Sequence, residues 1–168
     1  MMRLSLITTL ALLRAYSVGF ALEPGMIGRP APAFTLKTVD GVGSLSLADL
    51  RDNVVIIDFW ATWCAPCQRS LPRLSTFASK MPGVKVVAVN IDDERQNALE
   101  FLRKNKLKLT SVYDEMKRTV EHYDVSAMPS AFVVDKHGVV RFVHAGYNEK
   151  EIDLITNEAR GLAEGRIR

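Results

Sequence analysis

The sequence has few of the residues on which metal and haem sites depend. Its 168 residues include two cysteines and three histidines. A structural zinc site needs four ligands, and His122, His137 and His144 have no further ligand beside them at a metal-binding spacing. A c-type haem attachment site needs a histidine directly after the second cysteine of a C-x-x-C motif, and Gln68 stands there instead. We therefore expect no metal and no organic cofactor.

Repeats, long apolar runs and a strong charge imbalance are also missing. The apolar stretch at residues 4–13 is followed by Arg14 and is far shorter than the ~20 residues that span a bilayer. The formal net charge is +3, and without Arg3 and Arg14 the chain has 20 basic against 19 acidic residues. This balance gives no reason to expect binding to nucleic acid or to an anionic membrane surface. A hydrophobic fraction of 48% predicts one ordinary globular domain.

Residues 1–21 are interpreted as a signal peptide. Arg3 supplies the positive start, a mostly apolar stretch follows, and Gly19 and Ala21 provide the small residues of a cleavage site. The alternatives are an N-terminal helix of a cytosolic protein and an uncleaved anchor. After export, residues 22–168 would form the domain in the periplasm or another extracytoplasmic compartment, with no stable membrane insertion after cleavage, or held by a membrane tether. A C-x-x-C pair in such an oxidising environment needs a dedicated redox partner.

The two cysteines, Cys64 and Cys67, lie between a predicted strand and a predicted helix. Residues 54–60 are an apolar, β-branched run typical of a buried strand. After the motif, apolar residues recur at helical spacing, at Leu71, Leu74, Phe77, Ala78 and Met81. Residues three apart in a first helical turn share a face, so the two cysteines can close a short disulfide. The partial positive charge of the helix N-terminus favours a thiolate and lowers a thiol pKa from about 8.5 toward the range of roughly 3.5–7.5.

Two neighbours of the cysteines are candidate site residues. Pro66 fits the first helical turn, where its missing N–H costs little, and it removes a donor that could solvate a sulfur. Trp63 would place a large amphipathic ring at the rim of the site. A purely structural disulfide is an alternative, although so short a loop gains little stability from closure. The strand before the motif and the helix after it favour redox chemistry.

The segment Phe59-Trp60-Ala61-Thr62-Trp63-Cys64-Ala65-Pro66-Cys67 resembles the active-site segment of the thioredoxin superfamily. It is most similar to the TlpA/ResA/CcmG group of extracytoplasmic thiol–disulfide oxidoreductases, and the resemblance runs from about residue 28 to about residue 158. It implies an α/β fold, a thioredoxin-like three-layer α/β/α sandwich with a mixed central sheet. Two additions are expected: an N-terminal hairpin extension over residues 34–47, and a helix–strand insertion over residues 93–123.

The remaining elements follow from apolar periodicity and turn signals. We predict a helical turn at 49–52, strands at 84–91, 109–113, 130–134 and 139–144, and helices at 93–106, 115–123 and 149–160. His137 falls at a turn and His144 at a strand end. Both are expected to be exposed and to have no catalytic role.

The resemblance assigns a role to Asp58, which matches the buried acid that exchanges a proton with the second cysteine in thioredoxins. An aspartate buried inside an apolar strand destabilises the fold unless it is paired or neutral, and burial would raise its pKa. The alternative is a partly solvated aspartate at a strand end. Thioredoxins place a lysine near this acid, but the stretch 88–92 contains none. Ser70 is a second departure, because many TlpA-like proteins have a glutamate there.

Met128 and Pro129 match the residues that face the C-x-x-C motif in thioredoxin-like folds, where the proline is cis. The backbone of Met128 could then pair with an extended substrate segment. The alternative is an ordinary trans proline at the start of a strand, since only ~5–6% of X–Pro bonds in folded proteins are cis.

The resemblance implies thiol–disulfide exchange on other proteins outside the cytoplasm. Cys64 would be the exposed attacking cysteine, Cys67 the resolving one, and Asp58 the group that assists proton transfer at Cys67. The substrate-binding residues would be Trp63, Pro66, Met128 and Pro129. The resemblance to the TlpA/ResA/CcmG proteins favours action as a reductant. It implies a membrane electron donor as partner and apocytochrome c or a copper-site assembly protein as client.

Two other functions compete with this one. A peroxiredoxin-like thiol peroxidase needs a proline seven residues before its cysteine, and Ile57 is there instead. A Cu(I)-binding assembly protein could use the two thiolates, although no Met or His ligand lies nearby in sequence.

Overall fold

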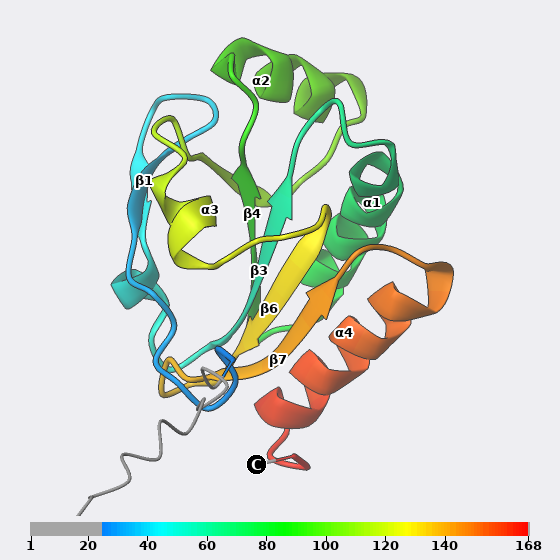
Figure 1. The fold of residues 1–168 in the computed structure, drawn as a ribbon. Helices are drawn as coiled ribbons and strands as arrows, with labels where there is room; N and C mark the ends of the chain where they lie inside the picture. Colours follow the sequence, from blue (N-terminus) through cyan, green and yellow to red (C-terminus); the bar gives the residue numbers. More distant parts are fainter. Residues whose placement is uncertain (1–24, 168) are drawn as a thin grey trace, which may run out of the picture.

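The computed structural model describes residues 25–167, so the predicted signal peptide lies outside the described residues. Seven strands form one mixed sheet in the order β2-β1-β5-β4-β3-β6-β7 (Figure 1). The strands are β1 (Thr35–Thr38), β2 (Ser44–Ser46), β3 (Val54–Trp60), β4 (Val84–Asn90), β5 (Thr110–Tyr113), β6 (Ser130–Val134) and β7 (Val140–Ala145). The helices are the 3-10 helix η1 (Leu47–Leu50) and the α-helices α1 (Ala65–Lys80), α2 (Arg95–Lys104), α3 (Arg118–His122) and α4 (Glu149–Ala163).

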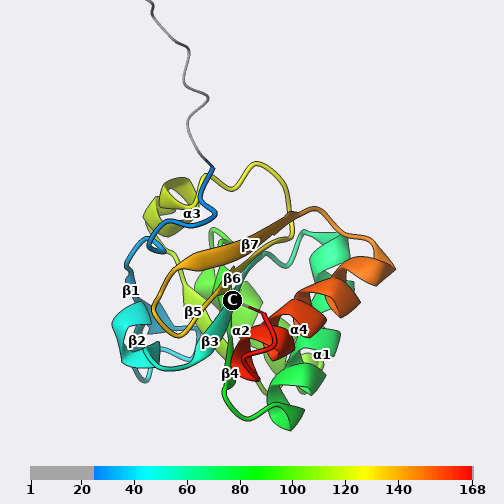
Figure 2. The same cartoon turned by 90° about the horizontal axis from the view of Figure 1, so that it is seen from below.

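The central strand β3 is apolar on both faces because both faces are covered. All seven of its side chains are buried. Val55 and Ile57 pack in a cluster that includes Tyr123, just after α3, whereas Val54 and Ile56 pack against residues of α1 and α4. Seen from below, α1 and α4 lie together on one side of the sheet and α3 lies on the other (Figure 2). The predicted three-layer α/β/α sandwich is therefore confirmed.

Both predicted additions to the sheet are present. Strands β1 and β2 form an antiparallel hairpin at one edge, and β1 also pairs antiparallel with β5. Strand β5 follows α2 in the chain and pairs parallel with β4, so the insertion supplies the strand that joins the hairpin to the core. The parallel pair β3–β4 and the antiparallel pair β3–β6 make the sheet mixed, as expected.

Several element boundaries differ from the prediction. The helical turn expected at 49–52 is η1, two residues earlier. Helix α3 begins at Arg118 rather than at residue 115, because Lys117 has a left-handed backbone (φ 57°) and its N–H closes a turn onto the carbonyl of Asp114. Helix α4 runs on to Ala163, and Ala159 and Leu162 in its last turns are buried in the core.

The expected exposure of His144 was wrong, whereas His137 lies exposed at its turn as predicted. His144 is only 8% exposed, because it lies on the face of β7 that α4 covers. Its Nδ1 and Nε2 atoms each lie 2.7 Å from a carboxylate oxygen of α4, on Glu151 and Glu158 respectively. Between residues 25 and 167 no helix has the length and apolar character needed to cross a membrane.

Candidate active site

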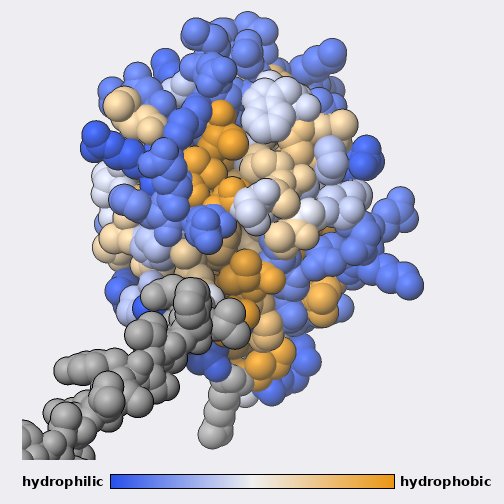
Figure 3. Space-filling model, in the orientation of Figure 1, coloured by the Kyte–Doolittle hydropathy of each residue, from blue (hydrophilic) through white to orange (hydrophobic). Residues whose placement is uncertain are grey.

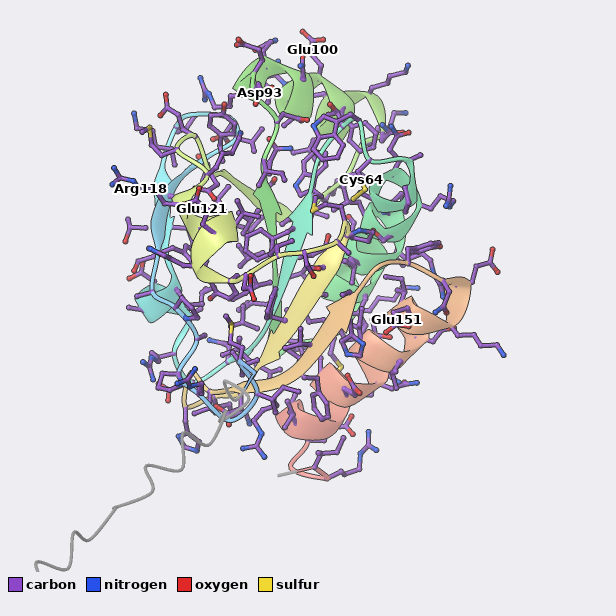
Figure 4. All side chains as sticks on the ribbon, viewed as in Figure 1. Cys64, Asp93, Glu100, Arg118, Glu121 and Glu151 are labelled. Atoms are coloured by element: carbon purple, nitrogen blue, oxygen red, sulfur yellow. A yellow bond between two sulfur atoms is a disulfide. The ribbon has the colours of Figure 1, made fainter. Side chains whose placement is uncertain are left out.

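Cys64 and Cys67 form a disulfide where β3 gives way to α1 (Figure 4). Cys64 is the N-cap of α1, with an extended backbone, and its Cα lies 5.3 Å from that of Cys67. The backbone N–H of Cys67 donates a hydrogen bond to Cys64 Sγ over 3.2 Å. Pro66 occupies the first turn of the helix, where an N–H is dispensable. The Cys64 sulfur thus lies where backbone donors and the helix dipole stabilise negative charge.

The two sulfurs differ in accessibility. Cys64 is 5% exposed, and Cys67 is completely buried. Cys64 is therefore less open than the sequence suggested, but it is the only one of the two that an incoming group can reach. Trp63 is 65% exposed beside it, as expected of a residue at the rim.

Asp58 lies in the middle of β3, and the alternative of a solvated strand end was wrong. It is 1% exposed, and its neighbours across the sheet are Ala88 of β4 and Ala131 of β6. Its Oδ2 atom has no hydrogen-bond partner among residues 25–167. Burial without a compensating donor raises the pKa of Asp58 from 3.8 to about 8. A group with such a pKa can accept or release a proton near neutral pH.

The peptide bond between Met128 and Pro129 is cis, as the resemblance implied. Pro129 directly precedes β6, whose first residue Ser130 pairs with Phe59 near the end of β3. Met128 is half-buried and packs against the cluster that contains both cysteines. The Pro129 carbonyl accepts a hydrogen bond of 2.8 Å from the N–H of Gly146. The fold thus brings Met128 and Pro129 to the same end of the sheet as the disulfide.

The surface at this end has an apolar centre. Figure 3, drawn in the orientation of Figures 1 and 4, shows tan and orange surface in this area with hydrophilic residues around it. The half-buried residues Ile91 and Met128 belong to the apolar cluster of the disulfide, and the Trp63 ring stands out beside it. Such a surface suits a partner that also presents apolar groups.

Sequence reasoning missed the polar contacts that hold the loop before Cys64. The N–H and hydroxyl of Thr62 donate to the carboxylate of Asp92, which follows β4. The side-chain amide of Gln68, in α1, donates to the carbonyl of Thr62 over 2.7 Å. The only available signal was an Asp-Asp pair directly after a buried strand, and this does not reveal which residue it contacts. Within the part of the chain that the structure describes, no cluster of three or more His, Cys, Asp or Glu side chains could hold a metal ion.

A C-x-x-C disulfide at a helix N-terminus, with a cis-proline just before the neighbouring strand of a mixed sheet, is the architecture of a thioredoxin-like redox protein. A protein-family model described as the AhpC/TSA family matches residues 27–143, and the chain belongs to this family.

The names of similar proteins specify which kind of redox reaction this class of protein carries out. The chain is 29% identical to the thiol-disulfide oxidoreductase ResA of Geobacillus thermodenitrificans, over 89% of this chain and 91% of that protein. It is 33% identical to the thiol:disulfide interchange protein DsbE of Escherichia coli, over 74% of this chain and 68% of that protein. A crystal structure from Chlorobium tepidum, described as a DsbE-type interchange protein, superposes with a TM-score of 0.75 at 33% identity, covering 80% of this chain and 98% of that one. The chain is accordingly a thiol–disulfide oxidoreductase of the ResA and DsbE type.

Proposed function

We propose that Cys64 and Cys67 reduce disulfides of other proteins outside the cytoplasm, with Cys64 as the attacking residue. The observation that carries the proposal is the asymmetry of the disulfide: Cys64 is the accessible helix N-cap, and Cys67 is buried behind it. The names of the relatives support exchange between thiols and disulfides.

The reaction takes two exchange steps. The Cys64 thiolate attacks one sulfur of the client disulfide, forms a mixed disulfide and releases the other client sulfur as a thiolate. The Cys67 thiolate then attacks Cys64 Sγ, breaks the mixed disulfide and releases the second client sulfur. The client gains two electrons and this protein loses two, which leaves the Cys64–Cys67 disulfide of the structure. A membrane electron donor would reduce that disulfide again.

Asp58 is proposed to take the proton that Cys67 must lose before it attacks. Asp58 lies on the face of β3 that α1 covers, since Ile56 and Trp60 on either side of it pack there. A pKa raised by burial to about 8 makes this carboxyl a proton acceptor of suitable strength, because a thiol has a pKa of about 8.5. The reverse transfer would serve the oxidising direction.

The client would lie across the apolar surface beside the disulfide. Trp63 and Pro66 border it on the side of α1, and Met128 and Pro129 border it on the side of β6. Met128 lies outside the strands, so its backbone is a suitable place for an extended client segment to pair. Apocytochrome c, whose haem-binding cysteines need to be reduced, is the client class that the TlpA/ResA/CcmG resemblance favours, with a copper-site assembly protein as the second choice.

Two cysteine variants test the proposed chemistry. Cys64→Ser should abolish turnover with a protein disulfide, and Cys67→Ser should accumulate a mixed disulfide that is visible on a non-reducing gel. Full turnover by Cys67→Ser would show that Cys67 does not resolve the intermediate. The direction is tested by equilibrating the protein in thiol buffers: a reduction potential near about −270 mV supports a reductant, and one near about −120 mV supports an oxidant.

The proposed location rests on the sequence of residues 1–21, with its basic start and small residues at positions 19 and 21. Expression of the full chain in a Gram-negative bacterium, followed by fractionation and mass determination, tests it. A product that begins at residue 22 in the periplasm supports export and cleavage. Intact protein confined to the cytoplasm contradicts it.

A further inference from the structure

Asp92, two residues after the end of β4, has a buried carboxylate that contacts the turn before the disulfide. It is 1% exposed, and its carboxylate accepts three hydrogen bonds of 2.9–3.0 Å, from the N–H and hydroxyl of Thr62 and from the side-chain amide of Asn90. A buried carboxylate is tolerated only when donors surround it in this way. Removing it would leave the N–H of Thr62 and the amide of Asn90 without acceptors.

These bonds fix the turn that leads into the cysteines. The Cys64 N–H donates to the Ala61 carbonyl over 3.2 Å, which makes Thr62 and Trp63 the central residues of a turn. Thr62 is held on both sides, because its N–H binds Asp92 and its carbonyl accepts from Gln68 in α1. The turn is thereby tied to the end of β4 and to the first turns of α1.

The backbone of Asp92 is itself anchored. Its N–H donates to Asn90 Oδ1 over 3.1 Å, and its carbonyl accepts from the ammonium group of Lys117 at the start of α3. Lys117 has a left-handed backbone, with φ 57°, which is unfavourable for a residue other than glycine. The hydrogen bond from the Lys117 ammonium group ties the backbone of Asp92 to the start of α3.

We infer that Asp92 is a positioning residue for Cys64: by holding the turn of residues 61–64, its carboxylate keeps Cys64 Sγ at the N-terminus of α1. The inference rests on the proposed role of Cys64 as the attacking cysteine. The sulfur meets the N–H of Cys67 and the positive end of the helix only while Cys64 occupies the N-cap. Loosening the turn should therefore raise the pKa of the Cys64 thiol and slow its reactions near neutral pH.

A direct effect of the Asp92 charge would act in the opposite direction. A negative charge near a thiol disfavours the thiolate, so removing that charge would lower the pKa of Cys64. Positioning and direct repulsion therefore predict shifts of opposite sign, and a single titration separates them.

The experiment measures the alkylation rate of Cys64 by iodoacetamide against pH, in the reduced full-length protein, with the site identified by mass spectrometry. Asp92→Ala should slow alkylation at pH 6 by roughly 3- to 10-fold, because a rise of one pKa unit removes about nine-tenths of the thiolate. Asp92→Asn should keep nearly the wild-type profile, since an amide oxygen can still accept from Thr62. Its lost bond from Asn90 should appear only as a lower melting temperature.

Asp135→Ala is the matched control. Asp135 also accepts two backbone hydrogen bonds through one oxygen, from His137 over 2.9 Å and from Val139 over 3.0 Å, but it does so in the turn between β6 and β7 at the other end of the sheet. This variant should lower the melting temperature without changing the alkylation profile. Should Asp92→Ala fail to fold, Thr62→Val removes only the hydroxyl bond and should slow alkylation by about 2-fold.

Three results would overturn the inference: faster alkylation of Asp92→Ala at pH 6, an Asp92→Ala protein whose melting temperature falls while its alkylation profile stays that of the wild type, or an unchanged profile in Thr62→Val. The wild-type profile tests the proposed function separately. If Cys64 in the unaltered protein titrates like an ordinary thiol, near about 8.5, the attacking role of Cys64 is wrong whatever the variants do.

Discussion

Asp58, within β3, and Asp92, two residues after the end of the neighbouring strand β4, are equally buried and differ in almost everything else. Each is 1% exposed. Asp58 lies between two alanines of the adjacent strands, and one of its oxygens has no partner among residues 25–167. Asp92 is surrounded by donors from Thr62 and Asn90. Burial therefore does not decide what a carboxyl does; the donors around it decide. The first is suited to gain and lose a proton, and the second to hold a loop.

The largest expected effect is on the pH dependence of stability at Asp58. Its folded-state pKa is raised from 3.8 to about 8, so the unfolded chain ionises first and the folded state loses stability as the pH rises from about 4 to about 8. Asp58→Asn cannot ionise and should not show this loss. Its stability relative to the wild type should increase by up to roughly 5 kcal/mol between pH 4 and pH 9, measured by urea unfolding of the oxidised proteins. Parallel pH curves for the two proteins would show that Asp58 has an ordinary pKa.

Asp92→Ala should destabilise the protein, whereas Asp58→Asn should stabilise it at high pH. It leaves buried donors of Thr62 and Asn90 without an acceptor, which should lower the free energy of unfolding by about 2–4 kcal/mol at both pH 5 and pH 8. The same urea experiments measure this loss. A stabilised Asp92→Ala protein would mean that the two aspartates do not differ in the way their hydrogen bonds indicate.

His144 extends the comparison to a third buried ionisable group. Both its ring nitrogens have carboxylate partners on α4, so His144→Leu should lower the free energy of unfolding by about 2 kcal/mol. His137→Leu is the control, because that histidine is exposed at a turn and its replacement should change stability by less than about 0.5 kcal/mol. Equal effects of the two substitutions, in thermal or urea unfolding, would remove the distinction between them.

Trp63 gives the smallest expected effect on stability, because its side chain is 65% exposed. Trp63→Ala should change the free energy of unfolding by less than about 0.5 kcal/mol. If the ring contacts clients, the variant should reduce a protein disulfide several-fold more slowly while its rate with oxidised glutathione is unchanged. Equal slowing of both substrates would instead place the role of Trp63 within the disulfide site itself.

The sequence allowed prediction wherever a feature depends on nearby residues. The β-branched run at 54–60 predicted β3, helical spacing after Cys67 predicted α1, and the burial of Asp58 followed from its place in an apolar strand. The cis bond before Pro129 came from the family resemblance, not from any local preference. These features define the thiol chemistry, so the class of protein could be predicted.

Features that depend on distant contacts could not be predicted. His144 was expected at the surface because it falls at a strand end. Its partner Glu151 is seven residues away, across a loop and a helix start, and only the fold brings the two side chains together. The contact between Asp92 and Thr62 joins residues 30 positions apart. The shortened α3 reflects the left-handed backbone at Lys117, and no helix-breaking residue in the sequence marks that position.

The first described residues join the body of the protein at the end remote from Cys64. Gly28 and Ala31 bond to the backbone at Val140 and Gly138, next to the turn between β6 and β7, whereas the disulfide follows the opposite end of β3. Figure 1 shows this chain entering at the foot of the sheet. Anything that held the protein through residues before 25 would grip it by that foot. Cys64 Sγ would then lie at the opposite end of the sheet from the point of attachment. A client could approach the disulfide without meeting the attached end of the protein.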